Sequence, residues 1–214
     1  MSATLRRRAG LLALVLAAAA ALAGCGGAAG GDTSHGGGRW AVASPLPDGL
    51  AGRPAPDIRL ADARGGTFDT RSLAGRPYLV TFLYTTCPDV CPLIGDEIRQ
   101  ALAALGPQGG RVAAIAVSVD PRHDDAAAVR SWLARHREPP QFHYLIGIQR
   151  ALAPIWKAWF ASPQIAGDPQ SAHTAIVWLV DARGRLAANV SAGVAFDPRG
   201  LARDVRSLLP ASRS

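Results

Sequence analysis

From about residue 58 onward, short apolar runs alternate with segments in which apolar residues recur every three or four positions. The short runs predict buried strands, and the three-to-four spacing predicts amphipathic helices. The expected strands are 58–60, 67–68, 77–84, 112–119, 142–146, 175–180 and 186–190. The expected helices are 89–105, 124–133, 149–159 and 198–209. This alternation predicts an α/β fold with a parallel core, to which the hairpin at 175–190 adds an antiparallel strand.

The first 24 residues follow another pattern. Arg6–Arg8 precede Leu11–Ala23, an uninterrupted apolar run of 13 residues. A transmembrane helix needs about 20 apolar residues, so this run is typical of an export signal. It ends in Leu22-Ala23-Gly24-Cys25, which resembles a bacterial lipobox. We expect Cys25 to carry lipid and to hold the mature protein on the extracytoplasmic face of a bacterial membrane. The alternative is an ordinary signal peptide with a cysteine nearby.

A glycine-rich stretch follows Cys25, and a proline-rich one covers 45–56. With 214 residues, the chain is long enough for one ordinary domain and a tail. We therefore predict three parts: a lipoprotein signal peptide at 1–24, a flexible tether at 25–50 and a folded domain at 51–214.

The formal net charge of +7 does not indicate a polyanionic partner. Three of the 23 basic residues belong to the export signal, which leaves 20 basic against 16 acidic residues. These charges are scattered, without a basic cluster or interleaved aromatic residues. We therefore expect no nucleic-acid partner.

The two remaining cysteines, Cys87 and Cys91, lie where an expected buried strand passes into an expected helix. Ligand sites in such sheets lie beyond the carboxyl ends of the strands. Backbone N–H groups at a helix start lower the pKa of a cysteine. If the helix begins by Pro88, Cys87 and Cys91 share one face, with Cβ atoms about 5–6 Å apart. Both sulfurs can then reach one metal ion or form a disulfide. A purely structural disulfide is the alternative, but a bridge across so short a loop stabilises little.

A third metal ligand must come from elsewhere in the chain. His123 and His136 lie in charged surroundings and are interpreted as surface residues, and His143 as a partly buried strand residue. His173 ends a Gly/Pro/Gln loop immediately before the strand at 175–180, and this loop can bend over the cysteines. A lone histidine at the start of a strand is usually structural, so the residues alone leave both a structural and a metal-binding role open for His173. The lone His35 of the tether is interpreted as a solvated linker residue.

Residues from about Gly52 to Leu209 resemble the SCO/SenC family of copper-binding assembly proteins. The matching motifs are Phe82-Leu-Tyr-Thr-Thr-Cys87-Pro-Asp-Val-Cys91-Pro92, Val117-Ser-Val-Asp120-Pro121, and His173-Thr174 before Val180-Asp181-Ala-Arg-Gly184. The resemblance implies a thioredoxin-like fold with a mixed central sheet flanked by helices. It also implies one copper ion bound by Cys87, Cys91 and His173, with Asp120 nearby. The chain has His-Thr where His-Ser is common, and a lipobox where many relatives have a transmembrane helix.

The resemblance further implies a metallochaperone that delivers copper to the dinuclear copper centre of cytochrome c oxidase subunit II. The chemistry agrees, because thiolates select Cu(I) and imidazole suits copper. A zinc site would more often be closed by a fourth ligand, and no fourth cysteine or histidine is evident. The only methionine is the initiator, Met1, so a methionine-based site is excluded.

The alternative function is that of an enzyme, a thiol–disulfide oxidoreductase. Cys87 and Cys91 would be its redox pair, acting on cysteines of the oxidase subunit or of other exported proteins. A thiol reductant protein would then be a further partner. A copper carrier needs both cysteines and His173, whereas an oxidoreductase needs only the cysteines.

Overall fold

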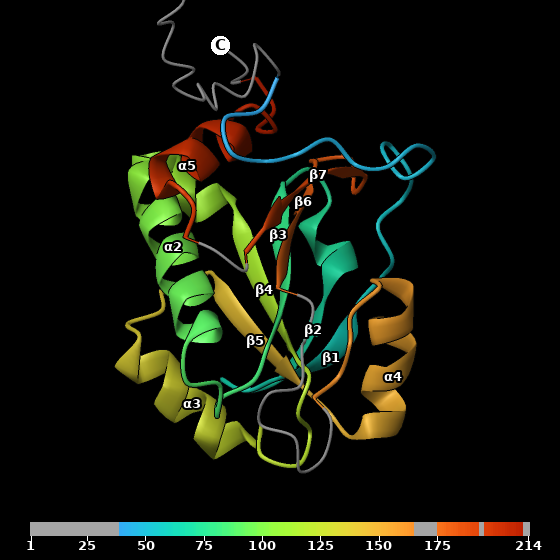
Figure 1. Cartoon of the computed structure of the whole chain (residues 1–214), viewed down its shortest axis with the longest axis vertical. Helices are drawn as coiled ribbons and strands as arrows, with labels where there is room; N and C mark the ends of the chain where they lie inside the picture. The colour runs from blue at the N-terminus through green and yellow to red at the C-terminus, as the bar shows by residue number, and fades with distance from the viewer. Residues whose placement is uncertain (1–38, 165–174, 193–194, 212–214) are drawn as a thin grey trace, which may run out of the picture. The chain divides into compact units, whose positions relative to one another are not determined.

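The computed structural model describes residues 39–164, 175–192 and 195–211 (Figure 1). Cys25, His35 and His173 lie outside these residues. The strands are β1 (Arg59–Asp62), β2 (Thr67–Asp69), β3 (Tyr78–Leu83), β4 (Ala113–Ser118), β5 (Phe142–Ile146), β6 (Ile176–Val180) and β7 (Leu186–Ser191). The helices are η1 (Thr70–Leu73), α2 (Val90–Ala104), η2 (Gly106–Arg111), α3 (Ala126–Arg135), α4 (Gln149–Ala158) and α5 (Pro198–Arg206).

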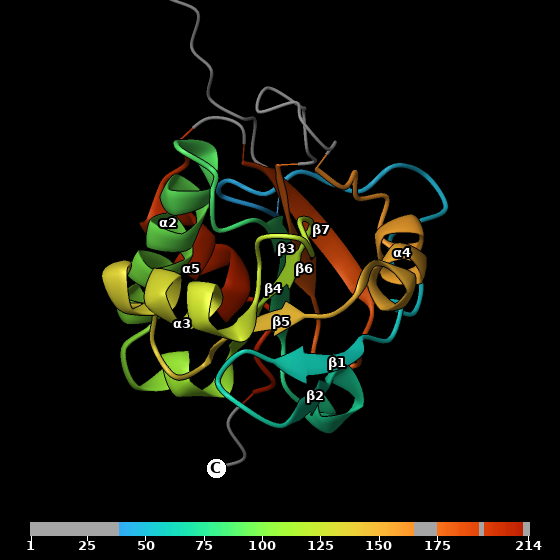
Figure 2. The same ribbon diagram turned by 90° about the horizontal axis from the view of Figure 1, so that it is seen from below.

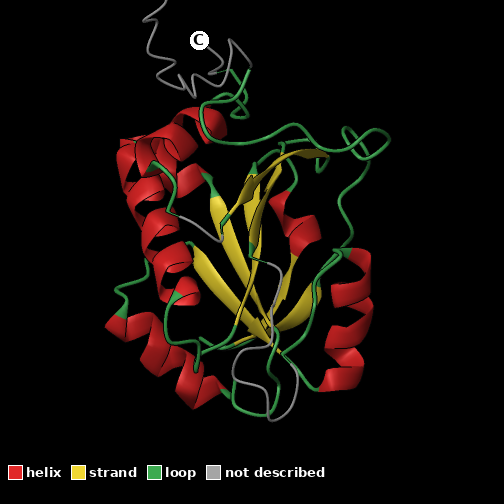
Figure 3. Cartoon of the chain, viewed as in Figure 1, coloured by secondary structure: helices red, strands yellow, loops and turns green. Residues whose placement is uncertain are grey.

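The strands form one seven-stranded sheet in the order β2-β1-β5-β4-β3-β6-β7. β3, β4 and β5 are parallel, whereas β6 runs antiparallel to β3 and β1 antiparallel to β5. Figures 2 and 3 show the helices on both sides of the sheet, with α2, α3 and α5 on one face and α4 on the other. The predicted α/β, thioredoxin-like fold with a mixed sheet is confirmed. None of the helices in the described ranges is long and apolar enough to cross a membrane.

The centre of the sheet is buried along its whole length and almost entirely apolar. All six residues of β3 and all six of β4 are buried. Strands covered by helices on both faces carry continuous apolar runs instead of alternating ones. This pattern places β3 and β4 side by side in the core, and their carboxyl ends point to the same edge of the sheet.

The helix that follows β3 obeys the expected spacing. Its buried residues include Cys91, Ile94, Ile98, Ala101 and Leu102. Asp89 caps its first turn by accepting the N–H of Val90. The chain does not leave the helix at Gly106-Pro107 as a plain loop but continues as the short 3₁₀ helix η2.

Within the predicted tether over 25–50, residues 41–46 pack on the folded domain instead of remaining separate from it. The buried carboxylate of Asp204, in α5, accepts the backbone N–H groups of residues 41–43. Leu46 is buried as well. The sequence pattern does not reveal this, because the partner of these backbone donors lies more than 150 residues away.

Candidate metal centre

Cys87 and Cys91 lie at the carboxyl ends of the central parallel strands, as predicted. β3 ends at Leu83, and a short turn that contains Cys87 leads into α2. The helix begins at Val90, two residues later than the shared-face argument assumed. Cys91 therefore lies in the first turn of α2, whereas Cys87 lies in the turn before it.

The two cysteines are nevertheless close to one another. Neither cysteine forms a disulfide with a described residue, and their exposed fractions are 5% for Cys87 and 0% for Cys91. The Cys91 N–H points at the Cys87 sulfur, with a nitrogen–sulfur distance of 3.3 Å. The Cys87 sulfur is also 3.7 Å from Oδ1 of Asp89. The Cys87 N–H donates to the carbonyl oxygen of Tyr84 at 3.3 Å, which closes the turn.

The surroundings shift the two thiols in opposite directions. Hydrogen bonding from the Cys91 side chain, with backbone N–H groups and the Tyr84 hydroxyl, lowers the pKa of Cys87 from 9.0 to about 6, against the effect of burial. Burial raises the pKa of Cys91 well above its usual value, and the neighbouring Cys87 adds to this effect. Near neutral pH, Cys87 is therefore the thiolate of the pair and Cys91 remains protonated.

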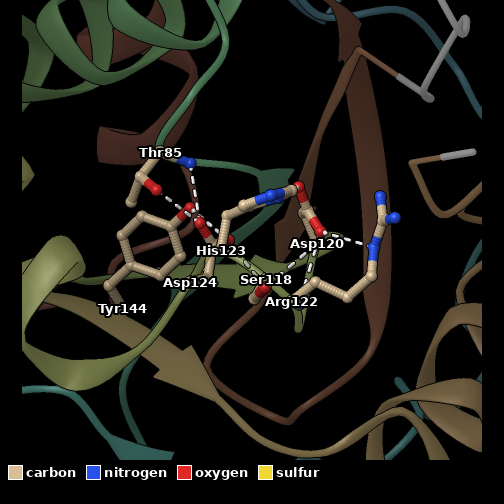
Figure 4. A network of polar contacts seen from close by, with 7 residues as sticks. All are labelled: Thr85, Ser118, Asp120, Arg122, His123, Asp124 and Tyr144. Carbon is tan, nitrogen blue, oxygen red and sulfur yellow. Dashed lines mark hydrogen bonds and ion pairs between the residues drawn. The ribbon is translucent and has the colours of Figure 1, made fainter. Parts of the chain in front are cut away.

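A buried carboxylate, Asp124, lies beside this turn (Figure 4). It accepts hydrogen bonds from the N–H of Thr85 at 2.8 Å and from the Thr85 hydroxyl at 2.6 Å. It also accepts from the hydroxyls of Ser118 at 2.7 Å and Tyr144 at 3.3 Å. Burial raises the pKa of Asp124 even though these hydrogen bonds favour its charged form.

Asp120, expected near the site, is buried in the same loop as Asp124. One of its oxygens lies 2.6 Å from Nδ1 of His123, and the other lies 3.5 Å from the guanidinium of Arg122 (Figure 4). The His123 side chain is 54% exposed, in agreement with its interpretation as a surface residue.

Of the two other histidines among the described residues, His143 matches its interpretation, whereas His136 is half-buried and not a fully solvated surface residue. His143 is partly buried and lies 2.7 Å from a carboxylate oxygen of Asp62. His136 follows the last residue of α3, and its ring contacts that of Trp132.

Two of the three predicted ligands thus lie together, and the third, His173, lies outside the described residues. Within the described part of the chain, no three His, Cys, Asp or Glu side chains gather as a metal site requires. The described residues that flank 165–174 both lie at the edge of the sheet where β3 and β4 end. Gln164 donates its N–H to Val119, just after β4, and β6 begins at Ile176 beside the end of β3.

Sequence reasoning missed the hydrogen-bond role of Asp124. It assigned this residue to a helix start, whereas Asp125 is the residue that caps α3. The only signal in the sequence is Ser118, a polar residue at the end of an otherwise apolar strand.

Comparison with known proteins finds matches to this chain in both sequence and structure. A sequence model of the SCO1/SenC family matches residues 51–210. The copper-bound structure of ScoI from Bradyrhizobium japonicum is 31% identical, with a TM-score of 0.63 over 73% of this chain and 100% of that one. The solution structure of apo Sco1 from Thermus thermophilus is 26% identical, with a TM-score of 0.65 over 79% of this chain and 97% of that one. The SCO2-like protein RC0895 of Rickettsia conorii is 25% identical over 137 residues, which cover 60% of this chain and 65% of that protein.

Proposed function

The chain belongs to the SCO1/SenC family, and on this premise we propose that it is an extracytoplasmic copper metallochaperone. Its cargo is one copper ion, held by Cys87, Cys91 and His173 and passed to the dinuclear copper centre of cytochrome c oxidase subunit II. The observation that carries the proposal is the pair of reduced cysteines at one strand-to-helix turn, with the Cys91 N–H on the Cys87 sulfur. The copper bound in the ScoI relative supports the choice of metal.

The donor set suits copper. Thiolate sulfur selects Cu(I), and imidazole nitrogen is also a good copper ligand. Cys87 offers a thiolate near neutral pH, and coordination of the metal deprotonates the buried Cys91 thiol. Two sulfurs and one nitrogen leave a face of the ion open, where ligands of the acceptor protein can replace those of the carrier.

The experiment is an anaerobic competition for Cu(I) between the reduced protein and a chelator of known affinity. We expect one Cu(I) per chain, and a loss of affinity of at least tenfold in His173→Ala, because one of three ligands is removed. His136→Ala is the matched control, since His136 lies at the end of α3 and contacts Trp132. Equal affinities of the wild type and His173→Ala would refute the three-ligand site.

A second function, thiol–disulfide oxidoreductase, is favoured by the opposite pKa shifts of the two thiols. The Cys87 thiolate would attack a disulfide of an exported protein and form a mixed disulfide. Cys91, after losing its proton, would then attack Cys87 and release the reduced substrate. A thiol reductant protein would restore the dithiol. Substrate reduction that survives in His173→Ala, in a protein that binds no Cu(I), would favour this function over copper transport.

The membrane anchor is a separate proposal, which rests on the lipobox at 22–25. Acyl chains on Cys25 would hold the protein on the extracytoplasmic face of a bacterial membrane. We expect Cys25→Ala to move the protein from the membrane fraction to the soluble fraction. Membrane attachment that persists in this variant would instead indicate a helical anchor.

A further inference from the structure

Asp124 does not cap α3, a role that belongs to Asp125, but its carboxylate accepts several hydrogen bonds. Four donor groups converge on its two oxygens: the Thr85 N–H, the Thr85 hydroxyl, the Ser118 hydroxyl and the Tyr144 hydroxyl. Its exposed fraction is only 3%, so water contributes little to holding these donors. A buried carboxylate with this many donors fixes the position of each of them.

The donors come from three adjacent strands of the sheet. Thr85 follows β3, Ser118 is the last residue of β4, and Tyr144 lies in β5. Asp124 itself lies in the loop between β4 and α3, and Figure 4 shows its side chain between Thr85 and Tyr144. The carboxylate therefore links the turn after β3 to β4 and β5.

This turn carries the first cysteine. Thr85 stands two residues before Cys87, and the Cys87 N–H closes the turn on the Tyr84 carbonyl. Thr85 is held through both its backbone and its side chain, so the path of the chain from β3 to Cys87 has little freedom. The same path determines whether the Cys87 sulfur lies 3.3 Å from the Cys91 nitrogen.

We infer that Asp124 is a positioning residue for Cys87, which holds the ligand turn in its metal-binding geometry before the metal arrives. This inference rests on the proposed copper site. A ligand that is held in place binds the metal without a further loss of chain freedom. Loss of partners that orient metal ligands typically weakens metal binding about 10–100-fold.

The neighbouring aspartate provides a matched control. Asp125 caps α3 by accepting the N–H of Ala128 at 2.7 Å, and in the described part of the chain no hydrogen bond joins it to the Cys87 turn. Asp125→Ala should therefore lower the melting temperature without moving Cys87. Thr85→Val provides a second, milder test, because it removes the hydroxyl that donates to Asp124 and preserves the shape of the side chain.

Two measurements on Asp124→Ala, Thr85→Val and Asp125→Ala test the inference. The first is Cu(I) affinity by anaerobic competition, where we expect a loss of about tenfold or more in Asp124→Ala and of severalfold in Thr85→Val. The second is amide hydrogen exchange of the reduced, metal-free protein. We expect the amides of positions 85 and 91 to exchange faster in Asp124→Ala and in Thr85→Val than in the wild type. In Asp125→Ala, affinity and exchange at these two amides should equal those of the wild type.

The two measurements separate this inference from the proposed function. A wild type that binds no Cu(I) would refute the copper site, and the exchange rates at Thr85 and Cys91 would still decide whether Asp124 holds the turn. Exchange at these amides that is equal in Thr85→Val and the wild type would overturn the inference. So would faster exchange with unchanged Cu(I) affinity. If Asp124→Ala does not fold, Thr85→Val decides.

Discussion

Glu138, which follows α3, is a buried carboxyl group whose ionisation should destabilise the fold. Its exposed fraction is 7%, and neither of its carboxyl oxygens has a hydrogen-bond partner among the residues that the structure describes. Burial raises the pKa of Glu138 from 4.5 to about 8, against the attraction of Arg99 and Arg64. In the unfolded chain the same group ionises at its ordinary pKa.

The sign of the pH dependence follows from this difference. Between the two pKa values the folded protein binds a proton that the unfolded chain has lost, so the free energy of unfolding falls as the pH rises from about 5 to 8. At about 1.4 kcal/mol per pKa unit, the difference between 4.5 and about 8 corresponds to roughly 5 kcal/mol as an upper value. Such a loss is comparable with the whole stability of a marginal domain.

The perturbation is Glu138→Gln, which keeps the shape of the side chain and removes its titration. The assay is urea unfolding of the reduced, metal-free protein at pH 5 and pH 8. We expect the free energy of unfolding of Glu138→Gln, relative to that of the wild type, to be about 2–5 kcal/mol higher at pH 8 than at pH 5. A difference between Glu138→Gln and the wild type that is the same at pH 5 and pH 8 would contradict the raised pKa, since it would mean that Glu138 ionises in the folded protein as readily as in water.

Three further outcomes test other parts of the structure. Gly95→Ala places a Cβ 2.7 Å from a carboxyl oxygen of Glu138. Urea unfolding should therefore show a free energy of unfolding about 1–3 kcal/mol lower than that of the wild type, although Gly→Ala in a helix usually raises it. Asp204→Ala leaves the N–H groups of residues 41–43 without their acceptor and should cost about 2–4 kcal/mol, with faster amide exchange there. Alkylation of Cys87 in the metal-free protein should follow its thiolate and reach half its maximal rate near pH 6; a midpoint near pH 9 would contradict the lowered pKa.

The elements of the fold were predictable because each satisfies its own local pattern. β3 and β4 are buried along their whole length and are almost continuous apolar runs in the sequence. The sequence predicts that the hairpin at 175–190 adds an antiparallel strand, but not that β6 pairs with β3, because local patterns do not set the order of strands in a sheet. For the same reason, nothing in the sequence indicates that Asp204 holds residues 41–43 on the domain.

The candidate site likewise contains residues that one short motif reveals and residues that only the fold brings together. Cys87 and Cys91 were found because both lie in one short motif at a strand-to-helix junction. Asp124 was not distinguished from Asp125 beside it, because both precede the same helix. What separates them is the presence of Thr85 and Tyr144 near Asp124, and the fold alone brings these residues together.

The asymmetry of the two thiols links the two proposed functions. In the proposed carrier, a thiolate at Cys87 would offer an incoming Cu(I) its first ligand, whereas Cys91 would have to lose a proton before it could bind. The same asymmetry makes Cys87 the sulfur that attacks a disulfide and Cys91 the one that follows. A disulfide between them occupies both sulfurs, so only the reduced pair can hold the metal. Copper loading of the proposed carrier is therefore governed by the redox state of this pair, and a reductant of exported thiols would act on copper delivery through it.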